Sequence, residues 1–330
     1  MKFKGDYLKM EHKTYAERVE DAVKNDRLDL ARELIEKRKV NYQKARKETE
    51  ERMQYYEDSG SGSMGVAMGF FCGNSEFEDI PKAEKDLEDR LVDIEIQEME
   101  KDLISLPEVQ SGKGVIQNEF HDYDVYDHTL KVAEILRSGE LKEMILSGKV
   151  RDKDLVAAAY LHDIGKPVVA KPRAYDGILQ YDEQGRQRHT FGDHEKVGEE
   201  MVREMDSGFF EEHGINQEKT ARLVGAHYAP MTWLKKLRKT EDFEEFYKTY
   251  KSFTDELEST GLAKETLELF CADTLGKGDS MEDENEVVSF FRAADATINR
   301  GVSPMNWLGV VYRNQYLGWK KEDKRYAIKK

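Results

Sequence analysis

The chain has 330 residues, of which 36% are charged and 38% hydrophobic, and its formal net charge is -15. This length can bury a substantial core, so we expect either one large domain or one domain with a helical extension. We favour the second organisation. The acidic balance disfavours a protein that grips nucleic-acid phosphates over its whole surface, although it is compatible with a local basic groove.

The N-terminal segment, residues 1–58, is predicted to be a charged helical extension. Its first residues lack the basic flank and apolar stretch of a signal peptide, and no segment approaches the roughly 18 apolar residues of a membrane span. We therefore expect a cytoplasmic protein without a membrane partner. Leu28, Ala31 and Ile35 form a narrow apolar stripe at helical spacing, which indicates a helix that covers part of the core or, alternatively, an arm for oligomerisation or a partner.

Residues 59–75 are predicted to be a linker or loop, because a run of alternating serine and glycine is followed by further glycines. No Gly-Lys-Ser/Thr follows these glycines, which argues against a phosphate-binding loop. Cys72 in this stretch and Cys271 are the only cysteines. The chain therefore has no disulfide framework and no cysteine-rich zinc site, and its thiols fit a reducing compartment.

Residues 76–330 are predicted to form a helical domain with its core at 115–298. Apolar residues recur at spacings of three and four in the segments 82–105, 124–137, 141–146, 154–164, 194–205, 217–227, 242–257, 263–275 and 286–298. Residues 177–191 are the exception and predict a small β-hairpin that turns at Gly185. The expected fold class is all-α, a helical bundle with a β-hairpin excursion and the N-terminal helical extension.

The strongest local signal is the stretch from Leu161 to Pro167, Leu-His-Asp-Ile-Gly-Lys-Pro. It closes a predicted helix that Asp152 caps. His162 continues the apolar face of this helix into the interior, and burying a polar group without a partner costs about 2 kcal/mol or more. A lone buried histidine is more often structural than a metal ligand, so this motif alone does not decide its role.

The same arrangement recurs on five predicted helices, each of which carries a histidine or an aspartate along its buried face. These residues are His128, His162, His194, His227 and Asp273. Together with Asp163 they favour a metal centre. Imidazoles combined with carboxylates suit manganese, iron, nickel or zinc, while a site with few imidazoles could take magnesium.

The order of these motifs resembles the HD superfamily of metal-dependent phosphohydrolases. The matching stretches, in chain order, are Asp124-Val-Tyr-Asp-His128-Thr-Leu, Ala158-Ala-Tyr-Leu-His162-Asp163-Ile-Gly-Lys166-Pro, Phe191-Gly-Asp-His194-Glu, Leu223-Val-Gly-Ala-His227 and Ala272-Asp273. Their spacing is most similar to the HD region of bacterial tRNA nucleotidyltransferases. Nothing before Gly114 offers the Gly-rich strand and paired aspartates of a polymerase head, so the resemblance implies the hydrolytic module and no nucleotide addition. The family usually has Gly-His where this chain has Asp193-His194.

The resemblance also implies the roles of individual residues. His128, His162, Asp163 and Asp273 would hold a first divalent metal, and His194 and His227 would hold a second, with Asp163 bridging both. One or two ions are expected. A metal-activated water would then hydrolyse a phosphomonoester or phosphodiester of a nucleotide or nucleic-acid-like substrate. Asp163 and Lys166 are the expected catalytic residues, and Lys166 would meet a phosphate oxygen unless it is a surface lysine at a helix end.

Lys235 and Lys236 follow His227 closely, with Trp233 beside them. They could steer a phosphate of a nucleotide or nucleic acid toward the site, with Trp233 stacking on a base, or they could belong to a solvated loop. His121 and His189 could line the pocket, and we leave them outside the metal set. Two other functions stay open, namely a di-iron oxygenase on the same fold and a binding protein whose metal only stabilises the fold.

Overall fold

The computed structural model describes residues 15–25, 27–58, 79–138, 149–240, 242–278 and 293–298. The chain divides into two compact units, Met1–Glu95 and Ile96–Lys330, and the division falls inside a helix. The predicted linker at 59–75 lies outside the described residues, and the predicted domain limits stay predictions. Within the described ranges, no helix combines the length and the apolar character that crossing a membrane requires.

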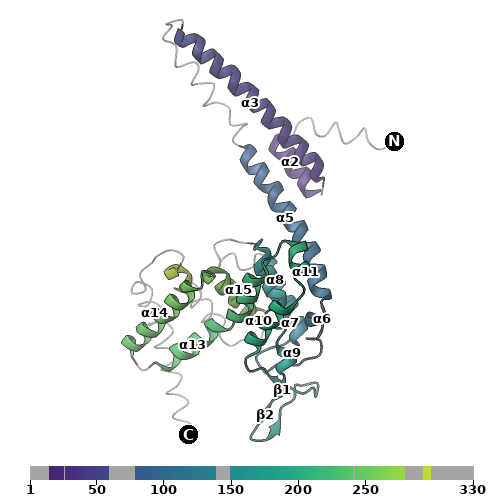
Figure 1. The fold of residues 1–330 in the computed structure, drawn as a ribbon, viewed down its shortest axis with the longest axis vertical. Helices are drawn as coiled ribbons and strands as arrows, with labels where there is room; N and C mark the ends of the chain where they lie inside the picture. Colours follow the sequence, from purple (N-terminus) through teal and green to yellow (C-terminus); the bar gives the residue numbers. More distant parts are fainter. Residues whose placement is uncertain are drawn as a thin grey trace, which may run out of the picture. The chain divides into compact units, whose positions relative to one another are not determined.

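The N-terminal unit contains α2 (Tyr15–Lys24), α3 (Leu28–Asp58) and the first part of α5 (Asp79–Ser105), and α2 lies along the first turns of α3 in Figure 1. Its core is a small apolar cluster of Val19, Ala22, Ala31, Ile35 and Leu87. Two residues of the predicted stripe, Ala31 and Ile35, are thus buried within this unit. The stripe packs α3 against its neighbours there.

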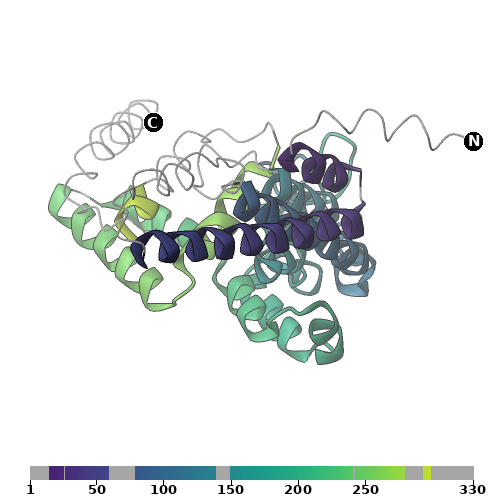
Figure 2. The same cartoon turned by 90° about the horizontal axis from the view of Figure 1, so that it is seen from above.

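The second unit is helical, which confirms the predicted fold class. Its helices are the rest of α5, α6 (Pro107–Gln110), α7 (Val125–Ser138), α8 (Lys153–Leu161), α9 (Lys166–Val169), α10 (His194–Glu204), α11 (Ser207–His213), α12 (Gln217–Ala226), α13 (Ala229–Lys239), α14 (Phe243–Ser259) and α15 (Ala263–Leu275). Helix α8 packs against α7, α12 and α15, and α10 packs against α12, while α14 lies at one side of the unit, apart from α8 (Figures 1 and 2).

Helix α8 is the centre of this unit because every residue from Leu155 to Leu161 is buried. As predicted, Asp152 caps its start: the carboxylate accepts hydrogen bonds from the backbone N–H groups of Asp154 and Leu155. A short helix that is apolar on all sides must be surrounded by other helices. The residues that follow its last turn therefore emerge in the interior.

The β excursion forms a twisted ribbon of two small sheets. Strand β1 (Lys171–Pro172) pairs with β4 (His189–Thr190), and β2 (Ala174–Tyr175) pairs with β3 (Ile178–Leu179), both antiparallel. The predicted hairpin is present, with Tyr181 bridging to Gln187 and Gly185 at a φ of 77° in its turn. The sequence analysis did not predict the preceding strand segment, β1 and β2. This segment pairs with both arms of the hairpin, β1 with β4 and β2 with β3.

Several helices differ from the prediction. Residues 141–146 lie outside the described residues, and of 286–298 only 293–298 are described, as helix. Helices α6, α9, α11 and α13 were not predicted. The interpretation of Lys235 and Lys236 as part of a solvated loop is wrong, because both lie on α13. In the sequence Pro230 suggests the end of a helix, but it occupies the first turn of α13, where a proline is well tolerated.

Candidate metal centre

Six side chains from five helices, or from the residues directly after them, meet in the interior of the second unit. His128 lies in the first turn of α7, Asp273 in the last turn of α15 and His194 at the start of α10. His162 and His227 stand at the C-terminal ends of α8 and α12, and Asp163 follows His162. All six are buried, with at most 6% of any of them exposed.

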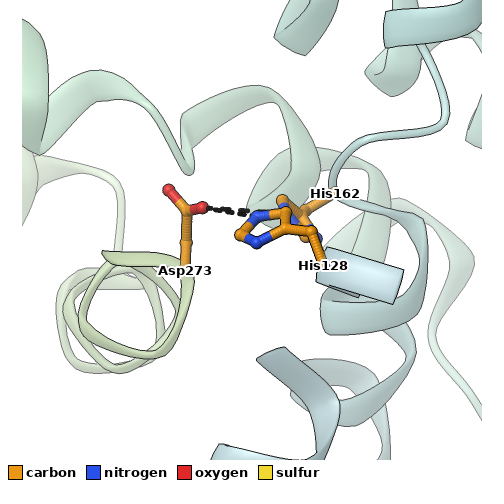
Figure 3. Close-up of side chains that lie close together, drawn as sticks. All are labelled: His128, His162 and Asp273. Carbon is orange, nitrogen blue, oxygen red and sulfur yellow. Dashed lines mark hydrogen bonds and ion pairs between the residues drawn. The ribbon is translucent and has the colours of Figure 1, made fainter. Parts of the chain in front are cut away.

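The first group of potential metal ligands consists of His128, His162 and Asp273 (Figure 3). The Nε2 atom of His128 lies 3.0 Å from Oδ1 of Asp273 and 3.4 Å from Nε2 of His162. One ligand atom from each residue lies within 4.8 Å of the others. Two imidazoles and a carboxylate at this spacing could hold one divalent ion.

The second group consists of Asp163, His194 and His227, again with ligand atoms within 4.8 Å of one another. Asp163 lies close to the histidines of both groups. Its Oδ1 lies 3.5 Å from Nε2 of His194 and 3.9 Å from Nε2 of His227. Its Oδ2 lies 3.2 Å from Nε2 of His162 and 3.6 Å from Nε2 of His128. One carboxylate therefore offers an oxygen to each group.

The Oδ1 atom of Asp163 is buried and finds no hydrogen-bond donor among the residues that the structure describes. Leaving a buried carboxylate oxygen without a partner is unfavourable by several kcal/mol in a site of low dielectric (order of magnitude). A cation among Asp163, His194 and His227 would satisfy this oxygen. The donor set and the orphaned oxygen together fit a divalent metal.

All four histidines are held in the same way. In each ring Nδ1 bonds to a backbone carbonyl, at Gly276 for His128 (3.0 Å), Ala159 for His162 (2.8 Å), Phe191 for His194 (2.9 Å) and Val224 for His227 (2.6 Å). A carbonyl only accepts, so the proton resides on Nδ1 and the lone pair of Nε2 faces the centre. The rings are thus oriented as metal ligands by bonds that do not depend on a metal.

The protonation states also suit metal binding. Burial alone would raise the pKa of Asp163, but His162 and Lys166 together hold it well below its usual range. Burial likewise opposes ionisation of Asp273, whereas Lys277 and His128 keep its pKa low. Burial, reinforced by His194 and His162, lowers the pKa of His227 to about 3. Metal ligands must be ionised carboxylates and neutral imidazoles, and Asp163, Asp273 and His227 meet that condition near neutral pH. His162 differs, because Asp163 outweighs the effect of burial and raises the pKa of its ring, so a metal bound there would displace a proton.

Lys166 is buried beside Asp163. Its Nζ donates to Oδ2 of Asp163 and to Oε1 of Gln117, both at 2.6 Å, and lies 5.6 Å from the ring centroid of Phe191. The ammonium group of Lys166 forms an ion pair with Asp163. Its contact with a substrate stays a prediction. Gln117, 1% exposed, was missed because a glutamine in an irregular segment carries no periodic signal.

Gly165, which directly precedes α9, allows this segment to approach α10. A Cβ at this position would lie 2.2 Å from the carbonyl oxygen of His194 and 2.8 Å from the backbone nitrogen of Gly198. Real side chains do not tolerate such distances. The glycine of the His162 motif therefore serves close packing between the segments that carry His162 and His194.

The remaining candidates lie around the centre. The His121 ring is 5.3 Å from that of His128, with Nδ1 at 2.8 Å from Oδ1 of Asn118, while His189 bonds to the carbonyl of Ile116 at 3.1 Å. Lys235 donates to the hydroxyl of Tyr228 at 2.6 Å.

Tyr228 itself was missed by the sequence analysis. Its ring centroid lies 5.9 Å from that of His194 and 6.3 Å from that of His227. Lys236 lies over the Trp233 ring, with Nζ 3.8 Å from its centroid. Lys235 thus contacts a residue, Tyr228, that itself contacts the histidines, whereas Lys236 contacts Trp233.

Comparison with known proteins adds the family. The family model described as HD domain matches residues 125–290. A curated relative, the A-adding tRNA nucleotidyltransferase of Deinococcus radiodurans, is 29% identical over 124 residues, which make up 38% of this chain and 24% of the relative. The chain thus spans about a quarter of the length of that relative, and no solved structure matches. HD domains bind divalent metals and define a superfamily of metal-dependent hydrolases. The chain belongs to the HD domain family.

Proposed function

We propose that this chain is a phosphohydrolase that cleaves a phosphomonoester or phosphodiester of a nucleotide or nucleic-acid-like substrate. The observation that carries the proposal is the Asp163 carboxylate, whose two oxygens face two separate groups of imidazoles while Oδ1 lacks a hydrogen-bond partner among the described residues. Such a carboxylate is suited to lie between two cations. The nucleotide character of the substrate is supported by the relative named for its action on tRNA.

In this proposal His128, His162, Asp163 and Asp273 hold one ion, and Asp163, His194 and His227 hold a second. Four imidazoles favour manganese, iron, nickel or zinc over magnesium. When bound, the metal supplies positive charge that lowers the pKa of a water molecule and offsets the charge of the phosphoryl oxygens.

The chain's own residues contribute orientation and charge balance. The four bonds from Nδ1 to backbone carbonyls prevent the rings from turning, so the Nε2 atoms converge without reorganisation. Lys166 fixes Oδ2 of Asp163 and thereby leaves Oδ1 directed at His194 and His227. The burial of all six residues excludes bulk water, which strengthens each electrostatic contact.

The test is a hydrolysis screen with protein stripped of metal by a chelator and then loaded with manganese, nickel, iron, zinc or magnesium. The substrates are p-nitrophenyl phosphate, its bis ester, nucleoside monophosphates and 2′,3′-cyclic nucleotides. Asp163→Ala serves as the blank. Asp255→Ala is the matched control, since Asp255 is an exposed carboxylate on α14.

We expect at least one metal to give turnover with wild type and Asp255→Ala that Asp163→Ala lacks. Equal behaviour of wild type and Asp163→Ala with every metal and substrate would refute the proposal. Oxygen uptake by the iron-loaded protein, without release of phosphate, would instead assign the same residues to an oxygenase.

A further inference from the structure

Most of the exposed large apolar side chains of the described residues lie on three segments, namely the segment before α7, helix α9 and the β ribbon. We call this group the rim surface; it consists of Phe120, Tyr123, Val168, Tyr175, Ile178, Leu179 and Tyr181. Among the residues that the structure describes, Val40 of α3 is the exposed large apolar residue that does not belong to the rim surface. Tyr175 and Ile178 are 74% and 68% exposed. Exposed large apolar side chains that are concentrated on a few connected segments mark a binding surface.

The segments that carry the rim surface are tied to each other. Arg173 of the β ribbon forms an ion pair with Glu119 at 2.6 Å. The backbone N–H of His189 donates to the carbonyl of Ile116 at 3.1 Å. The segment before α7 and the base of the β ribbon therefore form one connected surface.

The same segments contact the metal centre. Gln117 accepts a hydrogen bond from Lys166, and Phe191, next to β4, accepts one from Nδ1 of His194. The His121 ring stands edge-on to that of His128. A molecule bound to the rim surface would thus lie beside the residues that are proposed to act on the phosphoester.

The chemistry of this surface fits a nucleic-acid strand. Four of its seven residues are aromatic, and the β ribbon between them also carries Lys171, Arg173, Arg186 and Arg188. Residues 168–191 contain four Lys or Arg against three Asp or Glu, in a chain with a net charge of -15. Aromatic rings stack on unpaired bases, and Lys and Arg bind phosphates. A small phosphate ester alone would use none of these rings.

The extent of the surface indicates more than one nucleotide. At about 3.3 Å per residue, the strand segment from Lys171 to Tyr175 spans roughly 13 Å, and Figure 1 shows β2 farther from the helices than β1. A nucleic-acid strand advances about 3.4 Å per nucleotide in a duplex. At this spacing about four nucleotides match the length from Lys171 to Tyr175, which a mononucleotide is too short to cover.

We propose that the rim surface binds single-stranded nucleic acid and thereby places a phosphate group of that strand at the metal centre. The inference rests on the proposed phosphohydrolase function and specifies its substrate class as an oligonucleotide instead of a mononucleotide. Tyr175 and Tyr181 stack on bases away from the centre. Lys171 and Arg188 contact the backbone phosphates.

The test measures binding of fluorescein-labelled 12-nucleotide single strands of RNA and DNA by fluorescence anisotropy, with the whole chain and EDTA so that no turnover occurs. Tyr175→Ala and Tyr181→Ala should each weaken binding about 5- to 150-fold, the range for loss of one stacked base. Tyr175→Phe keeps the ring and should retain the affinity. Val40→Ala removes an exposed apolar side chain outside the rim surface and should change nothing.

The salt dependence of binding provides a second measurement. Lys171→Gln and Arg188→Gln should each reduce the slope of log Kd against log salt concentration by about one. Equal affinity of the tyrosine variants and wild type, or AMP competing as well as an unlabelled 12-mer, would overturn the assignment.

The two proposals fail in different ways. Hydrolysis of small phosphoesters without any oligonucleotide binding would remove the role of the rim surface and leave the hydrolase. Oligonucleotide binding that depends on Tyr175 and Tyr181, without turnover by any metal-loaded form, would remove the hydrolase and leave a nucleic-acid-binding surface.

Discussion

Replacing Lys166 by methionine removes a buried positive charge and leaves Asp163 with one ion-pair partner fewer. The pair is 2.6 Å long, and the side chains are 8% and 1% exposed. Breaking a buried pair in this way costs about 3–5 kcal/mol. Burial alone would lower the pKa of His162, but Asp163 outweighs it and raises that pKa, so His162 can carry part of the missing charge. We therefore expect Lys166→Met to lose about 3 kcal/mol of unfolding free energy in the metal-free protein.

A bound metal should reduce this loss, because the cation supplies positive charge beside the same carboxylate. The measurement is guanidinium unfolding followed by tryptophan fluorescence, in EDTA and in manganese. It reports on the second unit through Trp233, which lies on α13. Lys248→Met is the matched control, as Lys248 pairs with Glu244 at the same 2.6 Å but is 69% exposed. If both variants are equally stable in EDTA, the reasoning about burial is wrong.

Three further results are expected. Asp163→Asn should weaken metal binding at least about 100-fold by calorimetry, and an unchanged affinity would remove Asp163 from the ligand set. Gly165→Ala should destabilise the chain by about 1–3 kcal/mol and weaken metal binding, because its Cβ meets the backbone of His194; Gly192→Ala, with open space around it, should do neither, and equal effects would contradict the close-packing argument. The pKa of His227 is lowered from 6.5 to about 3, so between these values the unfolded chain binds a proton that the folded, metal-free chain does not. Its stability should fall as the pH drops through this window, and unfolding in EDTA at several pH values should show a slope for His227→Gln that is shallower by up to about 1.4 kcal/mol per pH unit.

The sequence by itself determined the helical class and the ligand types. An apolar stripe at a spacing of three and four predicts both a helix and its buried face, so a histidine on that stripe, such as His128 or His162, must enter the interior. Capping works in the same local way, which is why Asp152 could be recognised. These features depend on neighbours within about one helical turn.

Irregular segments were harder to predict. Gln117 and Tyr228 lie outside any periodic pattern, and the start of α13 was obscured by Pro230, which suggests a break unless its position in the first turn is known. The strand at 171–175 needs partners from residues 178–190 to be recognised as a strand. In each case the information resides in contacts between segments, which spacing along the chain does not contain.

Only the tertiary structure decided how the parts of the centre combine. The two faces of the Asp163 carboxylate, its pairing with Lys166 and the close approach at Gly165 depend on helices that are far apart in the sequence. The gathering of exposed aromatic residues beside the centre is likewise a property of the fold, since each is an ordinary residue in its own segment. Periodicity specifies which face of a helix is buried, whereas packing specifies what that face meets.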